Sequence, residues 1–310
     1  MEYQLYQFIF SGSVHFGDGS LEHTSYTFCA DTLFSALCQE ALKLGKETLE
    51  TLVRYVDEGG ILFSDAFPFM GEEYFLPKPV LHIEAGKASG DSTAKKAYKK
   101  LKYIPVNGFS EYLHGNLLPE AADVLDDLGE YQMKVSAAVR GEEETMPYRI
   151  ETFRFQKGSG LYVICGYQDE KKKLLLDELL EMLMLNGIGG RRSSGLGKFT
   201  CKAVKMPSLL KRWLLTEEAR YMTLSVSLPD DDMLATILEG ANYLMQKRSG
   251  FVASDKYAPE WMRKKDVYVF AAGSCFQTKY EGQLLDVSSG GRHPVYRYAK
   301  PIFLGLELKD

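Results

Sequence analysis

A stretch of glycines, serines and cations within residues 186–199 has the composition of an anion-binding loop. Glycine allows backbone conformations with positive φ and leaves room for a ligand to approach the backbone. Successive N–H groups in such turns form concavities that bind anions, and arginine and lysine side chains add charge that suits phosphate. The composition predicts a phosphate-binding loop, although a long flexible turn would have the same composition. The candidate residues are Gly187, Gly189, Gly190, Arg191, Arg192, Ser193, Ser194, Gly195, Gly197 and Lys198.

Two familiar nucleotide-binding motifs do not fit this stretch. In a P-loop, lysine and then serine or threonine follow the second glycine directly. Gly190 and Gly195 have the spacing of that motif, but Leu196 and Gly197 follow them. A dinucleotide fingerprint requires the order strand, glycines, helix, whereas here a leucine-rich helical pattern precedes the glycines and a β-like pattern follows. The predicted ligand is therefore a phosphate backbone of another kind.

A second candidate region is the turn-rich segment 13–20, which contains His15 and Gly17. In a ferredoxin-like half, this loop lies at the same end of the sheet as the start of the next helix. His15 and Gly17 could contact a ligand there, or they could form a structural turn in which His15 bonds to the backbone. A catalytic role for His15 would need a partner acid or base, and the nearness of His23 in sequence says nothing about geometry. Asp31 is predicted as the N-cap of the next helix rather than as a catalytic carboxylate.

Cations and aromatic residues also alternate after a glycine turn near the C-terminus, at Arg292, His293, Tyr296 and Arg297. This mixture suits base stacking combined with phosphate contact. It also suits a protein–protein interface, where tyrosine and arginine are enriched, and core packing is a third interpretation. A separate lysine cluster is either a solvated face or a mobile arm that binds phosphate. These lysines are Lys87, Lys95, Lys96, Lys99, Lys100 and Lys102.

The bulk properties restrict the function further. The chain has 310 residues and a formal net charge of −5, so any nucleic-acid binding must come from local patches. Its five cysteines are scattered without metal-ligand spacing, which fits reduced thiols in a cytoplasm. We find no signal-peptide pattern and no apolar run long enough for a membrane span. No metal and no cofactor are expected.

The elements that must position these residues follow an α+β pattern. Hydrophobic spacing predicts a first domain over 1–206 that begins as a ferredoxin-like or RRM-like half. Residues 77–158 resemble an insertion without a long core pattern, and within it 131–140 and 148–155 are predicted to form a hairpin with an acidic tip. The other predicted strands of this domain are 3–10, 61–63, 160–167 and 198–204, and its helices are 30–44, 47–56 and 171–185.

The second domain, 207–310, repeats this plan more loosely. A short helix with acidic N-terminal residues is predicted over 230–239. The predicted strands are 220–228, 242–252, 266–276 and 302–308. The fold class predicted from these patterns is α+β, with two tandem βαβ-like halves.

Four segments together carry a family resemblance. The glycine-rich loop after a helix resembles that of the RAMP superfamily, the RNA-binding proteins of CRISPR systems. Residues 15–20 (HFGDGS), 30–38 (ADTLFSALC) and 293–301 (HPVYRYAKP) narrow the match. Together they resemble the fourth subunit of type III-A (Csm) effector complexes, and the resemblance spans both halves of the chain.

This resemblance implies two tandem ferredoxin-like (RRM-like) domains and a subunit that holds the repeat-derived 5′ handle of the crRNA. It also implies contacts with the large polymerase-like subunit and with the first copy of the repeating backbone subunit, while target RNA is met only indirectly. Family members have a β-hairpin thumb in the first domain that packs over the guide. The hairpin within 131–155 is the candidate thumb, although the lysine segment 87–102 could contribute instead.

The function expected from the residues and the resemblance is a non-catalytic RNA-binding and assembly subunit in the cytoplasm. One alternative is a metal-independent endoribonuclease that processes crRNA. Such an enzyme needs a base beside a 2′-OH, for which His15, Lys198 and His293 are the candidates. A protein scaffold without direct RNA contact is the other alternative.

Overall fold

The computed structural model describes residues 1–17, 19–83, 100–138, 146–254 and 256–308. Its largest sheet has seven strands in the order β5-β4-β3-β8-β1-β9, with β2 also paired to β8. All neighbouring pairs in this sheet are antiparallel. The strands are β1 (Glu2–Phe10), β2 (Ile61–Phe63), β3 (Phe67–Met70), β4 (Glu73–Pro77), β5 (Tyr103–Pro105), β8 (Ser159–Tyr167) and β9 (Phe199–Val204).

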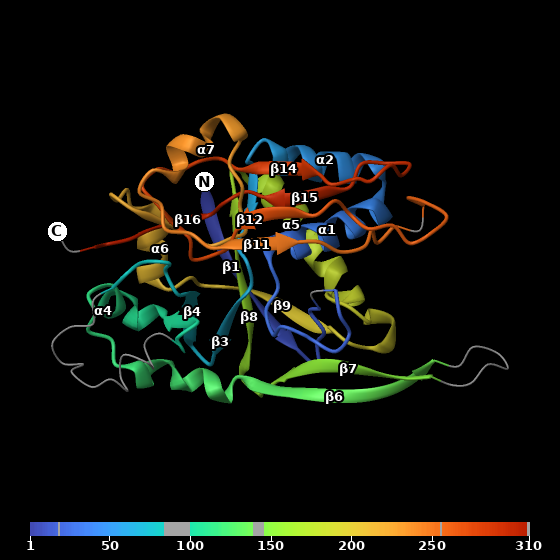
Figure 1. The fold of residues 1–310 in the computed structure, drawn as a ribbon, viewed down its shortest axis with the longest axis horizontal. Helices are drawn as coiled ribbons and strands as arrows, with labels where there is room; N and C mark the ends of the chain where they lie inside the picture. Colours follow the sequence, from blue (N-terminus) through green and yellow to red (C-terminus); the bar gives the residue numbers. More distant parts are fainter. Residues whose placement is uncertain (18, 84–99, 139–145, 255, 309–310) are drawn as a thin grey trace.

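The central sheet is covered on both faces, and the alternation of side chains along β1 reflects this. Tyr6 and Phe8 belong to one hydrophobic core, whereas Leu5, which precedes Tyr6 and therefore points to the opposite face of the strand, belongs to a second core. Helices α1 (Ala30–Leu44), α2 (Lys46–Asp57) and α5 (Glu170–Asn186) supply the first core from one side (Figure 1). Every residue of β8 is buried, as a strand between two layers requires.

Residues 207–310 form shorter strands and two helices. Both hydrophobic cores contain residues from each side of position 206. Among the residues after 206, Tyr298 lies in the first core and Trp213 lies in the second. None of the described helices is long and apolar enough to cross a membrane. The elements are α6 (Ser208–Leu215), β10 (Tyr221–Thr223), α7 (Asp231–Leu238), β11 (Met245–Arg248), β12 (Val267–Phe270), β13 (Cys275–Phe276), β14 (Gln283–Asp286), β15 (Tyr296–Ala299) and β16 (Phe303–Gly305).

Long periodic segments were predicted with the correct type, and α1 has the predicted bounds 30–44. In residues 207–310, the predicted strands are shorter than expected; for example, 220–228 contains β10 over only three residues. Helix α6 and the strands β3, β4, β14 and β15 lie outside the predicted elements. Most of them are shorter than the window over which a hydrophobic period can be recognised.

Part of the predicted insertion, residues 101–117, contributes to the second hydrophobic core. Ile104, Phe109 and Tyr112 are buried in the second core. The ring centroids of Phe109 and Trp213 lie 5.3 Å apart. Because these apolar residues belong to very short elements, they show no extended period. The elements are β5, the 3-10 helices η2 (Val106–Gly108) and η3 (Pro119–Asp127), and α4 (Phe109–Leu113).

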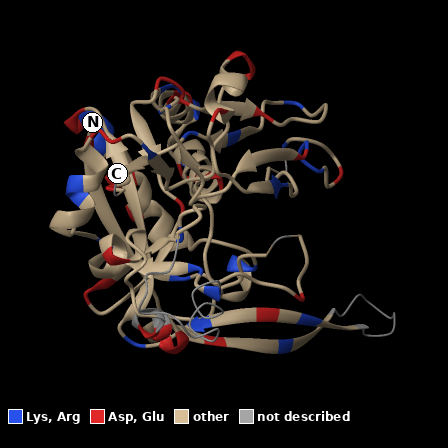
Figure 2. Ribbon diagram, turned by 60° about the vertical axis from the view of Figure 1, so that its left-hand side comes forward, with Lys and Arg blue, Asp and Glu red and all other residues tan. Residues whose placement is uncertain are grey.

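The predicted hairpin is confirmed as β6 (Gly129–Ala138) and β7 (Met146–Phe155). The two strands pair in one continuous antiparallel register from Gly129↔Phe155 to Ala138↔Met146. The hairpin lies along the lower edge of the molecule in Figures 1 and 2, and its charges are mixed in sign (Figure 2). It packs on the body through Phe153, which pairs with Val14 and lies in the first core. The predicted acidic tip comprises residues 141–147, of which 141–145 lie outside the described residues.

Candidate nucleic-acid interface

The glycine-rich loop is a closed, hydrogen-bonded structure rather than an extended flexible turn. Ile188 N–H donates to the Gly197 carbonyl at 3.0 Å, so the two ends of the loop are tied together. The Ile188 side chain is fully buried. Gly197 has φ 72, and a Cβ there would lie 1.9 Å from the Ile188 carbonyl oxygen, so only glycine fits this position. Helix α5 ends at Asn186, and its C-cap residue Gly187 also has a positive φ of 74.

Several backbone N–H groups of this loop are already used inside the protein, and two of them bond to segment 13–20. Gly190 N–H donates to the His15 carbonyl at 2.8 Å, and Gly197 N–H donates to the Ser13 carbonyl at 3.0 Å. The expected cradle of free N–H groups is therefore smaller than the sequence suggested. These bonds instead join the loop to segment 13–20, so the two predicted regions form one wall.

The two arginines of the loop have partners in the fold. Arg191 adopts a left-handed conformation with φ 58, which is unfavourable for a residue with a side chain. Its guanidinium carbon lies 5.1 Å from the centre of the Tyr148 ring in the β6–β7 hairpin. Arg192 donates to Gln39 Oε1 at 2.9 Å. The side chains of Ser193, Ser194 and Lys198 are exposed and do not line the cavity described next.

His15 connects three elements. Its side chain is buried, and Nδ1 lies 2.8 Å from the Glu151 carbonyl of β7. The ring packs so closely against Gly17 that a Cβ there would lie 2.6 Å from His15 Nε2. A Cβ on Gly190 would lie 2.9 Å from His15 Cδ2. The backbone-bonded interpretation of His15 thus describes its geometry, and the ring holds the turn, the hairpin and the glycine-rich loop together.

A cavity of about 420 Å³ lies between this wall and residues of the second half of the chain. Segment 15–19, the start of α1 and the glycine-rich loop line one side. The opposite side comes from the end of β11 and the segments around it. Its lining there consists of Gln246, Lys247, Arg248, Ser249, Gly250, Lys264 and Arg297.

Positive charge is concentrated on that opposite side. Arg248 donates to Asp31 through Nη2 at 2.6 Å and Nε at 3.0 Å, and Arg297 Nη1 donates to Asp31 at 2.5 Å. Burial, reinforced by the charge of Arg297, lowers the pKa of Lys264. Lys247 on this side is paired with Asp266. The other three cations, Arg248, Arg297 and Lys264, face two carboxylates even when the nearby carboxyl of Asp65 is ionised. Since uncompensated buried charge is costly, an anion in this cavity would be stabilised.

The prediction that Asp31 caps α1 is wrong. Asp31 lies within the first turn of the helix, and the capping position is Cys29, which makes no side-chain capping bond. Asp31 is instead buried. Burial alone would raise its pKa, but the guanidiniums of Arg248 and Arg297 outweigh this effect and hold the pKa below its usual value. The Ala30 N–H is satisfied by Asp65 Oδ1 at 2.8 Å.

The C-terminal candidate residues lie in different environments: of Arg292, His293, Tyr296 and Arg297, only Arg297 lines the cavity. Arg297 lines the cavity, but it is only 4% exposed and ion-paired to Asp31, so it forms part of the wall rather than a free phosphate ligand. Arg292 and His293 do not line the cavity. His293 Nε2 lies 2.9 Å from Ser254 Oγ, and the Arg292 N–H donates to the Tyr257 carbonyl. Tyr296 is half-buried at the start of β15.

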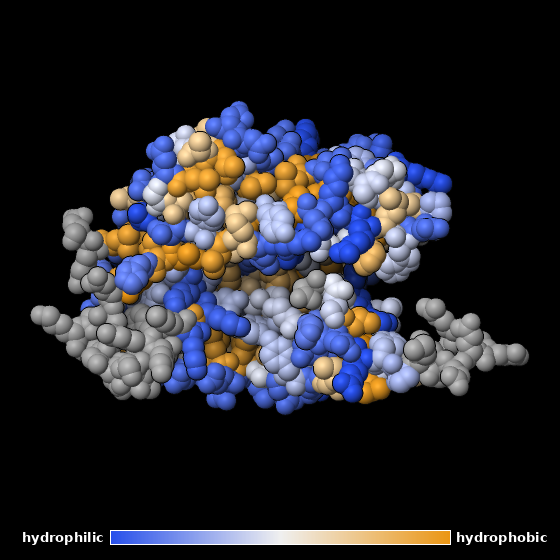
Figure 3. Space-filling model, in the orientation of Figure 1, coloured by the Kyte–Doolittle hydropathy of each residue, from blue (hydrophilic) through white to orange (hydrophobic). Residues whose placement is uncertain are grey.

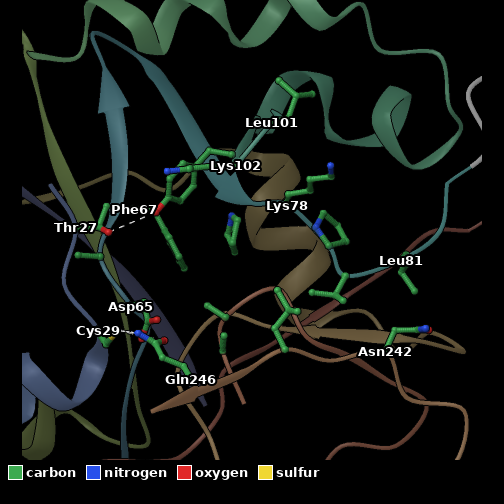
Figure 4. Close-up of a pocket in the computed structure, with 18 of the residues that line it drawn as sticks. Thr27, Cys29, Asp65, Phe67, Lys78, Leu81, Leu101, Lys102, Asn242 and Gln246 are labelled. Atoms are coloured by element: carbon green, nitrogen blue, oxygen red, sulfur yellow. Dashed lines mark hydrogen bonds between the residues drawn. The ribbon is translucent and has the colours of Figure 1, made fainter. Parts of the chain in front are cut away.

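A second cavity of about 730 Å³ adjoins the first. The two share Thr27, Phe28, Cys29 and Gln246 in their linings. Figure 4 shows Cys29, Asp65 and Gln246 together at one end of the second cavity, and Lys78 and Lys102 at the other. We call the two adjoining cavities the furrow. Figure 3 shows a hollow across this face, between the upper body that contains β11 and β12 and the lower layer that contains the hairpin.

Sequence reasoning missed the cations of the opposite wall. Arg248 and Lys264 lie near the two ends of a hairpin segment, and the available signal was the clustering of cations at 247–248 and 263–265. Of the predicted lysine cluster, Lys87, Lys95, Lys96 and Lys99 lie outside the described residues. Lys102 lines the second cavity, while Lys100 lies near the base of the hairpin. Among the residues that the structure describes, no group of three or more His, Cys, Asp or Glu side chains could hold a metal ion.

Comparison with known proteins gives matches along the whole chain. Residues 216–306 match the family described as CRISPR Csm4 C-terminal domain. A protein of Mycobacterium tuberculosis (strain H37Rv) named CRISPR system Cms protein Csm4 is 39% identical over 308 residues, covering 99% of this chain and 98% of that protein. A protein of the same name from Streptococcus thermophilus is 35% identical and covers 99% of this chain and 100% of that protein.

Solved structures have the same fold. The Csm3-Csm4 subcomplex of the type III-A CRISPR-Cas interference complex contains a chain that matches with a TM-score of 0.67 at 18% identity, covering 98% of this chain and 99% of that chain. The Csm1-Csm4 cassette in complex with cA4 contains another, with a TM-score of 0.62 at 20% identity and complete coverage of both chains, 100% each. The mixed helices and antiparallel sheets described above are therefore those of these proteins.

Proposed function

This chain belongs to the Csm4 family of CRISPR systems, and on that premise we propose that it binds the 5′ handle of the crRNA in the furrow. The observation that carries the proposal is the meeting, in one cavity, of the glycine-rich wall with an excess of cations on the opposite side. A phosphate backbone supplies the anion that this arrangement lacks. Such contacts fix the position of an RNA without reading its sequence.

Each wall has a distinct part in holding the RNA. Ser193, Ser194 and Lys198 are exposed on the glycine-rich wall and offer hydroxyl donors and charge. Lys264 on the opposite wall supplies a cation that no described carboxylate pairs with directly. The second cavity contains the amides of Asn242 and Gln246. Amide groups suit the edges of bases, which single-stranded RNA can turn outward.

The strand order supports two tandem ferredoxin-like (RRM-like) domains, 1–206 and 207–310. In the first, the order β9-β1-β8-β3 is that of a βαββαβ unit with its fourth strand beside the first. In the second, 221–228 runs between two neighbours: Leu228 N–H donates to the Ala299 carbonyl, and Ser227 bridges Phe270. Strand β11 pairs with β12 at the edge of this half. The strand order here is therefore related to that of the first half.

We assign the thumb role to the β6–β7 hairpin. Its position along the lower edge of the molecule, with Tyr131, Met133 and Val135 of β6 exposed, supports this assignment (Figures 1 and 2). So does the contact of Arg191 with Tyr148, which links the hairpin to the glycine-rich loop. In this arrangement an RNA that leaves the furrow along the glycine-rich wall meets the hairpin next. Most of the lysine segment 87–102, the other thumb candidate, lies outside the described residues.

The proposed role is non-catalytic assembly within the cytoplasm. Relatives occur in structures named as complexes with Csm3 and with Csm1, which supports docking of the first backbone subunit and of the large polymerase-like subunit. Target RNA would be met indirectly, through the guide. The five free cysteines are buried or half-buried, which supports a reduced thiol state.

The endoribonuclease alternative has less support in the geometry. The Nδ1 atom of His15 is held by a backbone carbonyl, and its Nε2 side is covered by Gly17. His293 bonds to Ser254 and does not line either cavity of the furrow. Incubating the purified chain with repeat RNA tests this point. Specific cleavage that His15→Ala abolishes would contradict the binding-only function.

The binding proposal is tested by replacing Arg191 and Arg192 together with alanine and measuring affinity for handle RNA at two salt concentrations. The expected result is weaker binding and a smaller salt dependence, because phosphate contacts release counterions. A double alanine variant of Lys211 and Arg212, both exposed on α6, is the matched control. Unchanged affinity and salt slope relative to that control would support a scaffold without RNA contact.

A further inference from the structure

We propose that Phe251, Trp261 and Arg263 form a stacking platform for an unpaired base of single-stranded RNA, at the rim of the first cavity. We call these three residues the aromatic platform. The proposal rests on the proposed RNA-binding function and extends it, because it adds a contact outside the furrow. It also names the chemistry of that contact, which is the face of a base rather than a phosphate.

The aromatic platform is exposed to an extent that the hydrophobic effect does not favour. Trp261 is 86% exposed and Phe251 is 48% exposed. The two rings meet edge to face with centroids 5.9 Å apart. The Arg263 guanidinium carbon lies 5.6 Å from the centre of the Phe251 ring. An aromatic pair backed by a guanidinium is the composition that stacks bases without regard to sequence.

The platform is held in place by backbone pairing. Phe251 and Arg263 form an antiparallel bridge. Lys264 N–H donates to the Gly250 carbonyl at 2.9 Å, and Val252 N–H donates to the Met262 carbonyl at 2.9 Å. Because both strands of this bridge are fixed, the rings are presented at low entropic cost to a ligand.

A small hydrophobic cluster supports the platform from behind. Tyr257, Val287 and Val295 form this cluster, and Val252 and Met262 pack against it. Tyr257 is 1% exposed, and its hydroxyl accepts a hydrogen bond from the Ser289 N–H at 2.6 Å. The loop that carries the exposed rings is therefore packed on its own small core. A poorly packed loop does not explain why the rings are exposed.

The position and charge of the platform favour RNA over a protein partner. Gly250 and Lys264, its immediate neighbours in sequence, line the first cavity. Segment 247–266 contains six cations and three carboxylates, although the whole chain has a net charge of −5. Tryptophan and arginine are also enriched in protein interfaces, but lysine is depleted there. Lys256 and Lys265, both exposed, lie within the same segment.

Tryptophan fluorescence tests the platform directly, because the chain has only two tryptophans and Trp213 is buried. Titration of the full chain with single-stranded handle RNA should quench the emission of Trp261. The quenching should disappear in Trp261→Phe, which leaves Trp213 as the sole emitter. An abasic oligonucleotide of equal length should bind without this quenching.

Affinity provides the second readout. Trp261→Ala should weaken binding of handle RNA by about tenfold, and Trp261→Phe should recover most of the affinity because it keeps an aromatic face. Leu185→Ala is the matched control, since Leu185 is 84% exposed on α5, outside the linings of both cavities. Its affinity should equal that of the unaltered chain.

Three results would overturn the platform. One is quenching of equal size by the abasic oligonucleotide. Another is an affinity of Trp261→Ala equal to that of Leu185→Ala while Arg191 and Arg192 remain essential, which would remove the platform and leave the proposed function intact. The third is a loss confined to binding of a partner subunit, which would make the patch a protein interface. If the unaltered chain binds no handle RNA, the proposed function itself fails.

Discussion

The glycine-rich wall and the opposite wall of the first cavity are built by different physical means. The glycine-rich wall depends on backbone geometry: positive φ values, close approaches and hydrogen bonds to the carbonyls of Ser13 and His15. Its arginines have partners within the fold. The opposite wall depends on charge, because Arg248, Arg297 and Lys264 surround the single carboxylate of Asp31.

The two walls therefore contribute differently: one sets the shape of the cavity, and the other supplies the charge that attracts an anion. The glycine-rich wall, whose composition predicts an anion cradle, mainly fixes the form of the cavity and the position of the hairpin. The attraction for an anion comes largely from the wall that contains Lys264. Changes in the two walls should therefore have different consequences for stability and for RNA binding.

The largest expected effect is that of Asp31→Ala in the charged wall. Removing this carboxylate leaves Arg248 and Arg297 buried without their partner, so the free energy of unfolding should fall by about 3–5 kcal/mol. Urea denaturation measures the loss. Glu50→Ala, which breaks an exposed ion pair with Lys46, should cost at most about 1 kcal/mol. Similar losses in the two variants would contradict the account of a buried charged wall.

The glycine-rich wall should respond to geometry alone. Gly195 and Gly197 both have positive φ, but a Cβ at Gly195 would meet no atom within 4 Å, whereas one at Gly197 would collide with the Ile188 carbonyl. Gly195→Ala should cost about 1–2 kcal/mol from the backbone conformation. Gly197→Ala should cost about 1–3 kcal/mol more from the collision. Thermal unfolding of the two variants compares them, and equal stabilities would mean that the loop is flexible after all.

The junction between the halves should respond to pH through Asp65. Its Oδ1 accepts from the N–H groups of Ala30 and Val226, and burial raises its pKa to about 6. The folded state therefore binds this proton more tightly than the unfolded state, so this group reduces stability as the pH rises from about 4 to about 6. The lowered pKa of Asp31 has the opposite sign and acts at lower pH.

Asp65→Asn isolates the contribution of Asp65. Asparagine retains an acceptor oxygen for both N–H groups but does not titrate. At pH about 8 the variant should be more stable than the unaltered chain by about 1–3 kcal/mol, and at pH about 4 the two should be equal. Urea denaturation at both pH values checks this. A stability difference that does not depend on pH would show that Asp65 titrates normally.

Much of this architecture could be predicted from the sequence, but the charged wall could not. The periodic elements α1, α5 and β8 carry their own pattern, and the glycine-rich loop is recognisable from composition. The pairing of Asp31 with Arg297 joins residues 266 positions apart, and local sequence offers no signal for such a contact. For the same reason Asp31 was expected to cap a helix, which requires only local information.

The most direct test of the central claim is Lys264→Ala, assayed for handle-RNA affinity across a salt series together with its unfolding free energy. The account predicts affinity about tenfold weaker and a salt slope smaller by about 0.7, the value for one phosphate contact on a single strand. It also predicts no loss of stability, because burial and the charge of Arg297 lower the pKa of this lysine and so disfavour its cation in the folded state. Affinity and slope equal to those of Lys211→Ala would contradict the claim that the furrow binds RNA through its charged wall.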